Sequence, residues 1–200
     1  RYTSSGLHQT ETDMTHASSV LQLLAIDVET ANRQDGRICQ VGIASLAESG
    51  VAIVLDELIN PKGHFAKEFT RDYHGITQEM VKHCVEFDGL YPKLKEILAD
   101  RFVFSWHDFD SKQLSAACQR YALSPVPIVW LDACRAARRL WPHLREYKLN
   151  VVAKHFGVAL QHHNAASDAS ACMEIMRRAI EEYSFAEVVN AAFYRLHDAE

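Results

Sequence analysis

The sequence has no long hydrophobic run and little of the two residues that interrupt regular structure. Its 200 residues include 8 glycines and 5 prolines, and 48% of the residues are hydrophobic. Runs such as Val51–Leu55 have the length of a strand and fall far short of the roughly 18 residues that a membrane-spanning helix needs. The N-terminus is polar and lacks the apolar core of a signal peptide. These absences argue against a membrane protein and favour one well-filled globular core.

Disulfide and zinc-binding patterns are also missing. The cysteines form an odd count without a CxxC spacing, and four of them lie among apolar neighbours. We therefore expect buried free thiols in a reducing compartment, and hence a cytoplasmic location, rather than a disulfide framework or a zinc site. The five cysteines are Cys39, Cys84, Cys118, Cys134 and Cys172.

Basic residues are too few for a protein that grips long duplexes. The chain has 21 Lys and Arg against 26 Asp and Glu, which gives a formal net charge of −5. Binding along a phosphate backbone depends on a surplus of Lys and Arg. An acidic enzyme can still hold a short single-stranded end when metal ions supply positive charge. The motifs of nucleotide-binding loops, HExxH metalloproteases and GxSxG hydrolases are absent as well.

The chain shows no repeats or low-complexity linkers between residues 20 and 183, so we predict one domain over that range. The first residue is Arg1, and Met14 is a plausible native start. We therefore expect residues 1–19 to be a leader or an added segment. An amphipathic pattern over Phe185–Leu196 predicts a C-terminal helix in residues 184–200, packed on the edge of the domain or used for self-association.

Hydrophobic patterning predicts a mixed sheet flanked by helices. Leu21–Asp27 is nearly all apolar, as in a central strand that is covered on both faces. The short connections between the next two strands suit an antiparallel meander, and alternating helices and strands follow. The predicted strands are 21–27, 38–46, 51–58, 102–105 and 128–131, and the predicted helices are 77–85, 90–98, 111–121, 134–141, 149–156 with Gly157 as its C-cap, and 172–180.

Two carboxylates end the most apolar strand. Asp27 and Glu29 are separated by one residue, so their side chains project from the same face of the strand. Repulsion and desolvation make such a pair costly at the edge of a core unless a cation neutralises it. Hard divalent ions such as Mg²⁺ prefer oxygen ligands. The pair indicates a metal site, although a solvated strand end would show the same pattern.

Three further residues fit such a site but have ordinary alternatives. Asp110 follows a predicted strand and begins a helix, where an acid can simply be an N-cap, and Asp108 competes with it for any functional role. Asp168 could interact with a helix dipole. His163 could be a surface histidine, and the adjacent His162 is interpreted as a bystander.

Taken in order, these elements resemble the DEDDh exonuclease family, which includes the epsilon proofreading subunits of bacterial replicative polymerases. The resemblance covers roughly residues 20–183. It rests on the ordered occurrence of D-x-E-T, F-D and H-x-A-x-x-D. In this chain the corresponding segments are IDVETAN at 26–32, CQVG at 39–42, INP at 59–61, HGIT at 74–77, FD at 109–110, YKL at 147–149 and HHNAASDA at 162–169.

The resemblance implies a ribonuclease H-like α/β fold with a mixed five-stranded sheet, and a 3′–5′ exonuclease. It implies two Mg²⁺ or Mn²⁺ ions held by Asp27, Glu29, Asp110 and Asp168, with His163 as the general base. It therefore selects Asp110 over Asp108. The substrate is expected to be a single-stranded nucleic-acid 3′ end, DNA before RNA, which is degraded to nucleoside 5′-monophosphates.

The expected substrate contacts are Val28, Thr30 and Ala31, because this segment lies where the terminal nucleotide should sit. One departure from the family affects such contacts. Many members carry His-Asn four residues before the F-D pair, whereas this chain has Ser105-Trp106. Trp106 could stack on a base, but a tryptophan that leaves a strand can equally fill the core.

Two other classes of function are compatible with the same fold. A catalytically silent module could hold a nucleic-acid end or a protein, although the presence of all five catalytic residue types argues against it. A structural or assembly domain could use Phe185–Leu196 as an interface. A homodimer, or association with a polymerase, would also be compatible with catalysis.

Overall fold

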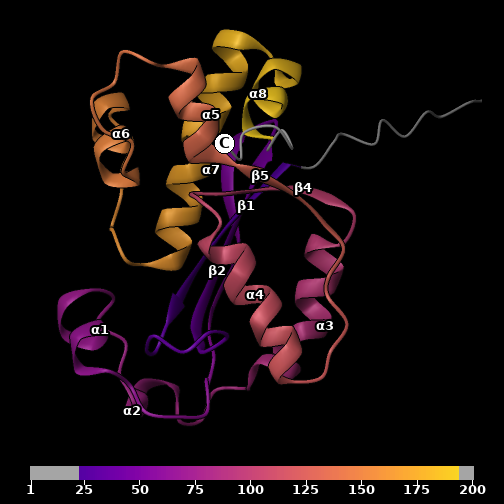
Figure 1. The fold of residues 1–200 in the computed structure, drawn as a ribbon, viewed down its shortest axis with the longest axis vertical. Coiled ribbons are helices and arrows are strands. Elements are labelled where there is room, and N and C mark those ends of the chain that lie inside the picture. The colour runs from indigo at the N-terminus through magenta and orange to yellow at the C-terminus, as the bar shows by residue number, and fades with distance from the viewer. Residues whose placement is uncertain (1–22, 194–200) are drawn as a thin grey trace, which may run out of the picture.

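The computed structural model describes residues 23–193 and contains one five-stranded sheet with helices on both faces (Figure 1). The strand order is β3-β2-β1-β4-β5, so the first strand is central, as the sequence predicted. The pairs β1–β2 and β2–β3 are antiparallel, whereas β1–β4 and β4–β5 are parallel. The strands are β1 Leu23–Thr30, β2 Ile38–Ala47, β3 Gly50–Leu58, β4 Arg101–Ser105 and β5 Ile128–Asp132.

Eight helices complete the described part of the chain, and three of them differ from the sequence-based expectation. The helix α1 was not predicted, and the helix expected over Thr77–Val85 shortens to α2 because Val85 instead accepts a hydrogen bond from the backbone of Asn60 (2.8 Å). A third helix, α7, also differs, because it begins at Ala165 and not at residue 172. The helices are α1 Lys67–Asp72, α2 Gln78–Val81, α3 Phe87–Leu98, α4 Phe109–Arg120, α5 Ala133–Leu140, α6 Leu149–Phe156, α7 Ala165–Tyr183 and α8 Phe185–Ala192.

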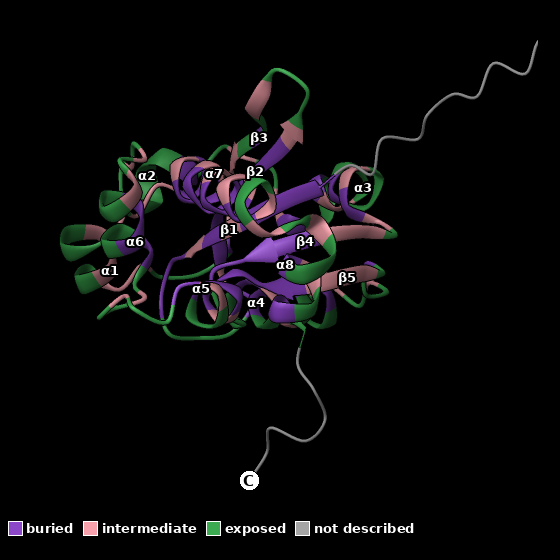
Figure 2. Ribbon diagram, turned by 90° about the horizontal axis from the view of Figure 1, so that it is seen from above, coloured by how far each residue is buried: buried purple, intermediate pink, exposed green. Residues whose placement is uncertain are grey.

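Side-chain alternation along β1 divides the core into two layers. Leu24, Ile26 and Val28 face α3 and α4, whereas Leu23 and Ala25 face the layer formed by α5, α7 and α8. Asp27 and Glu29 continue the second set, so both carboxylates lie on the α7 side of the sheet. Figure 2 shows the central strands buried, with exposed residues on the outer sides of the flanking helices.

The helix α8 packs on α5 and α7 through its apolar face. Val188, Ala191 and Ala192 are buried in the same core layer, and the Arg139 guanidinium donates to the Ala191 carbonyl (3.1 Å). Of the two roles expected for this segment, the structure shows packing on the domain. The leader predicted over residues 1–19, and Leu196 of the predicted helix, lie outside the described residues.

Other local predictions are confirmed within the described residues. Gly157 ends α6 in the left-handed conformation (φ 65°), which a glycine adopts without strain. The five cysteines are free thiols, and four of them are buried. In the part of the chain from Leu23 to Phe193, no helix combines the length and the apolar character that crossing a membrane requires.

The α7 helix approaches the sheet closely because β2 has a glycine there. A Cβ atom on Gly42 would lie 2.1 Å from the carbonyl carbon of Ala165 and 2.2 Å from the backbone nitrogen of Ala166. Gly42 is also the cross-strand neighbour of Asp27. The absent side chain therefore lets the start of α7 rest directly against the strand pair that carries the carboxylates.

We predict that Gly42→Ala lowers the free energy of unfolding by about 3 kcal/mol or more, since backbone atoms cannot yield as a flexible side chain can. For a protein of this size the melting temperature should fall by roughly 6–12 °C, measured by calorimetry. The control is Gly89→Ala, where the new Cβ would meet only the Val85 side chain at 3.2 Å. Equal melting temperatures for the two variants would contradict this packing.

Candidate active site

The site forms where β1 extends beyond its parallel neighbour. The pairing of β1 with β4 ends at Ala25 and Phe104, whereas β1 itself continues to Thr30. The Val28 N–H on that open side donates to the Asp110 Oδ1 atom at 3.0 Å. Asp110 lies in the first turn of α4 and is only 2% exposed. It thereby satisfies a strand N–H and brings a third carboxyl group to the end of β1.

Asp108 has a different role from Asp110. Its carboxylate pairs with Lys112 at 2.6 Å, one turn along α4, and about half of its side chain is exposed. It precedes α4 but makes no side-chain capping hydrogen bond. The structure therefore brings Asp110, and not Asp108, to the end of β1.

The fourth carboxyl group comes from the first turn of α7. Asp168 is 3% exposed, and its Oδ2 atom accepts a hydrogen bond from the backbone N–H of His163 (2.9 Å). Carboxylate oxygens of Asp27, Glu29 and Asp168 all lie within 4.8 Å of one another. Residues more than 130 positions apart in the sequence thus share one site.

His163 lies beside this cluster. Its Nδ1 atom is 4.0 Å from the Glu29 Oε1 atom, and its ring makes a T-shaped contact with the Tyr73 ring, with ring centroids 5.2 Å apart. Burial, and then the nearby His162 and His74, lower the pKa of His163 below its usual value. A neutral imidazole beside the carboxylates can accept a proton at neutral pH.

Burial raises the pKa of every carboxyl group in the cluster, and the charges of neighbouring carboxylates raise it further for three of them. Burial, followed by the charges of Asp110, Asp168 and Glu29, raises the pKa of Asp27 well above its usual value. Burial, followed by the charges of Asp168 and Asp110, raises the pKa of Glu29 to about 8. Burial raises the pKa of Asp110 to about 7, against the opposing effect of the Val28 hydrogen bond, and burial also raises the pKa of Asp168. Four carboxyl groups gathered at one strand end, two of them buried and two partly buried, fit a hard divalent cation.

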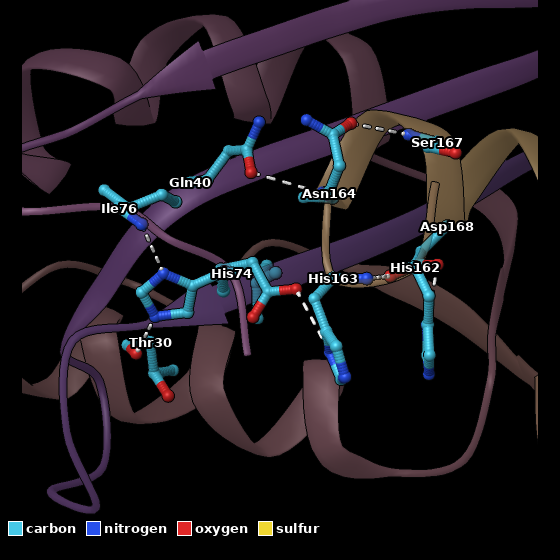
Figure 3. A network of polar contacts seen from close by, with 12 residues as sticks. Thr30, Gln40, His74, Ile76, His162, His163, Asn164, Ser167 and Asp168 are labelled. Atoms are coloured by element: carbon cyan, nitrogen blue, oxygen red, sulfur yellow. Dashed lines mark hydrogen bonds and ion pairs between the residues drawn. The ribbon is translucent and has the colours of Figure 1, made fainter. Parts of the chain in front are cut away.

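Two residues of the CQVG segment hold α7 in place. Gln40, which is the cross-strand neighbour of Glu29, accepts a hydrogen bond from the Ala165 backbone N–H (3.2 Å) and donates to Asp56 (2.8 Å). Gly42 provides the close approach described above. Asn164 then caps α7 by accepting from the Ser167 N–H at 3.0 Å (Figure 3). From the sequence, the CQVG segment was only one part of the family resemblance, and its role in positioning α7 was not predicted.

The HGIT segment supports the end of β1. The Nδ1 atom of His74 accepts from the Ile76 N–H (2.9 Å), so the Nε2–H donates to the Thr30 carbonyl at 3.0 Å. Burial lowers the pKa of His74, which favours this neutral form. His74 therefore fixes the backbone immediately after Glu29, a role that sequence reasoning missed.

The residues predicted to touch substrate are largely engaged within the protein. The N–H of Ala31 donates to Arg37, and its carbonyl accepts from Ala66, both at 2.9 Å. Trp106 is 9% exposed, and its indole N–H donates to the Tyr147 carbonyl (2.9 Å). This geometry favours core packing of Trp106 over base stacking. Val28 and Thr30 are buried as well.

Two aromatic rings that sequence reasoning did not select are exposed beside the site. Tyr73 is 56% exposed and contacts His163, and Phe109 is 46% exposed and immediately precedes Asp110. The sequence did not indicate that Tyr73 lies beside His163, because α1, which precedes Tyr73, was not predicted.

The chain belongs to the RNase T family of exonucleases, whose family model, described as "Exonuclease", matches residues 24–176. Within that family it is a DEDDh 3′–5′ exonuclease. The family is typically dependent on divalent metal ions. This assignment agrees with the convergence of Asp27, Glu29, Asp110, His163 and Asp168 at one strand end.

Curated relatives are similar over only part of their own length. DNA polymerase III PolC-type of Streptococcus pneumoniae serotype 2 (strain D39 / NCTC 7466) is 29% identical over 179 residues, which are 88% of this chain and 12% of that protein. The PolC-type polymerase of Clostridium perfringens is 28% identical over 164 residues, 78% of this chain and 11% of that protein. The chain thus spans about an eighth of the polymerases that it matches.

Solved structures show the same fold at lower identity. Exonuclease X, in complex with 5′ overhanging duplex DNA, superposes with a TM-score of 0.69 at 19% identity, covering 86% of this chain and 99% of that one. The nuclease domain of 3′hExo, a DEDDh family member bound to rAMP, gives a TM-score of 0.70 at 18% identity, covering 84% and 95%. These likenesses confirm the predicted ribonuclease H-like mixed sheet.

We predict that the metal-free protein is less stable at pH 8 than at pH 6. Folded Glu29 and Asp110 hold protons up to pH values of about 8 and 7, whereas the unfolded chain releases them near pH 4. The folded state therefore loses stability as the pH rises through this window. In the presence of EDTA the melting temperature should fall by roughly 5 °C or more between pH 6 and pH 8.

Mg²⁺ should reverse this loss, because it binds the charged carboxylates, and its stabilising effect should be larger at pH 8 than at pH 6. Asp27→Asn removes a carboxyl group whose own pKa is raised by burial in the folded protein, and it should therefore flatten the dependence on pH. A melting temperature in EDTA that rises from pH 6 to pH 8 would show that these carboxyl groups ionise without penalty.

Proposed function

We propose that this protein removes nucleotides from the 3′ end of single-stranded DNA, with two Mg²⁺ or Mn²⁺ ions, and releases nucleoside 5′-monophosphates. The observation that carries the proposal is the convergence of four carboxyl groups, two of them buried and two partly buried, and one imidazole at the end of β1. Asp27 and Glu29 come from β1, Asp110 from α4, and His163 and Asp168 from the start of α7. The backbone N–H of Val28 in β1 donates to Asp110 of α4, and the start of α7 rests on β2 at Gly42, opposite Asp27.

The four carboxylates are the groups that would hold the ions. When bound, divalent cations polarise water and offset the charge that develops on phosphate oxygens. The carboxylates would hold the positive charge of the cations near the open side of β1. Burial of Asp110 and Asp168 limits their motion, so these donors are in place before substrate arrives.

His163 is the residue placed to take the proton from the attacking water. Its lowered pKa keeps it neutral at neutral pH, and its Nδ1 atom faces the cluster from 4.0 Å. Phosphodiester hydrolysis requires water to lose a proton while the 3′-oxygen departs, and positioned bases typically contribute about 10²–10⁴-fold to the rate. Exposed Tyr73 and Phe109 supply apolar rings against which the terminal nucleotide can rest.

The choice of substrate rests on charge and on the relatives. A net charge of −5 disfavours a broad grip on duplex, so a short single-stranded end is the better fit. The curated relatives are DNA polymerases, and one similar structure carries overhanging duplex DNA. Because the related region lies within polymerase chains, a polymerase is also the first partner to test.

A silent binding module on the same fold is the alternative. It would hold a nucleic-acid end without cleaving it. Its retention of the carboxylate cluster would have no chemical purpose, since each buried carboxyl group costs free energy unless a cation is bound.

We predict that Asp27→Asn reduces turnover at least about 10³-fold with the fold preserved. One charge of the central cluster is lost while shape and volume are kept. The measurement is release of nucleotide from a 3′-labelled oligonucleotide in Mg²⁺. The matched control is Asp108→Asn, which removes an exposed acid close to the site in sequence and should keep most of the parental rate. Parental turnover by Asp27→Asn would refute the site.

We predict that His163→Ala loses about 10²–10⁴-fold in rate while its affinity for Mn²⁺ stays near that of the parent. The base is removed, but the carboxylate donors remain. Mn²⁺ binding is followed by electron paramagnetic resonance, and the rate by single-turnover kinetics. If Mn²⁺ affinity fell together with the rate, His163 would be a ligand instead of a base.

A comparison of three substrates tests the proposed preference for single-stranded DNA. The same labelled sequence is supplied as single-stranded DNA, single-stranded RNA and a mismatched duplex, each with Mg²⁺ or Mn²⁺. We expect single-stranded DNA to be degraded fastest, with nucleoside 5′-monophosphates as products. Faster degradation of RNA would reverse the assignment of substrate, and no degradation of any of the three would favour the silent module.

A further inference from the structure

We infer that His162, His163 and Asp168 form a second cation site, which takes Zn²⁺ or a similar transition metal and inhibits the enzyme. The site shares His163 and Asp168 with the proposed catalytic centre but adds a donor, His162, that the reaction does not use. The inhibitory consequence rests on the proposed function. The binding itself does not.

The two histidines lie parallel, with the ring centroids 4.0 Å apart and the ring planes at 18° (Figure 3). Side chains of consecutive residues in an extended chain point to opposite sides. Here the backbone of His163 adopts the left-handed conformation (φ 66°), which a residue with a Cβ seldom takes. The hydrogen bond from its N–H to Asp168 holds that conformation. The backbone thus turns both imidazoles toward one side.

Asp168 supplies the third donor. Its Oδ1 atom is 3.2 Å from the His162 Nδ1 atom, and a ligand atom from each of the three residues lies within 4.8 Å of the other two. One metal ion can bridge this triangle once the two imidazoles rotate out of their parallel stack and the donors draw closer, because Zn–N distances are only about 2.0–2.1 Å. The His162 side chain is 39% exposed, so an ion can reach it from solvent.

The donor types select the metal. Imidazole nitrogen is a good ligand for Zn²⁺, Ni²⁺ and Cu²⁺, whereas Mg²⁺ prefers oxygen. Asp27, Glu29, Asp110 and Asp168 are an all-oxygen set and suit Mg²⁺ or Mn²⁺. The two sites therefore differ in metal preference although they share Asp168.

Occupancy of the second site would disable the reaction in two ways. A metal on His163 occupies the nitrogen lone pair that would accept the proton from water. It also draws the Asp168 carboxylate toward His162. Mg²⁺ in excess should relieve this inhibition only weakly, because Mg²⁺ has low affinity for imidazole.

The experiment measures Zn²⁺ binding directly, by competition with a chromophoric zinc chelator in saturating Mg²⁺. We expect the parent to bind one Zn²⁺ and His162→Gln to bind it at least roughly tenfold more weakly, since one nitrogen donor is lost. The matched control is His155→Gln, which removes another exposed imidazole at the end of α6, and it should retain parental affinity.

Nuclease assays provide the second readout. For each variant the rate in Zn²⁺ is expressed relative to its own rate without Zn²⁺, and the half-inhibitory concentration should rise at least roughly tenfold in His162→Gln alone. Equal zinc affinity for the parent and His162→Gln would place Zn²⁺ on the carboxylates and overturn the inference. A parent that degrades no oligonucleotide would refute the proposed function, while the chelator competition would still decide whether the second site exists.

Discussion

The crowding of four carboxyl groups at the end of β1 is the constraint on which this structure depends. Burial raises the pKa of each of them, and the charges of neighbouring carboxylates raise the pKa of Asp27, Glu29 and Asp110 further. Such a cluster costs folding free energy, and the surrounding elements are built to hold it nonetheless: His74 fixes the strand backbone, and the N–H groups of Val28 and His163 each bind one of the carboxylates. A fold that carries this cost has use for a cation at that place.

The assembly follows from the unequal lengths of neighbouring strands. Because β1 extends beyond its pairing with β4, the backbone N–H of Val28 has no partner in β4. This N–H donates instead to the Asp110 carboxylate at the start of α4. On the covered face, Gly42 and Gln40 of β2 receive the first turn of α7 directly opposite Asp27 and Glu29. Contacts made by the backbone therefore set the distances between the carboxyl groups of the cluster, although these groups come from distant parts of the sequence.

Much of this arrangement could be predicted from the sequence, and the failures have physical reasons. Apolar runs located all five strands, and the order of the acidic motifs identified the cluster. The helix α1 was missed because it buries no side chain and has no capping hydrogen bond, so it leaves no periodic pattern. Trp106 was offered as a stacking residue because nothing in the sequence reveals that the Tyr147 carbonyl binds its indole N–H. His162 was interpreted as a bystander, since its alignment with His163 depends on one left-handed backbone angle.

The most direct test of the central claim is the location of Mn²⁺ by anomalous X-ray scattering from crystals grown with MnCl₂ and a nucleoside 5′-monophosphate. We predict two anomalous peaks, both held among Asp27, Glu29, Asp110 and Asp168, and neither bound to His163. Well-ordered crystals in which these carboxylates bind no manganese, while the ion is found elsewhere on the molecule, would contradict it.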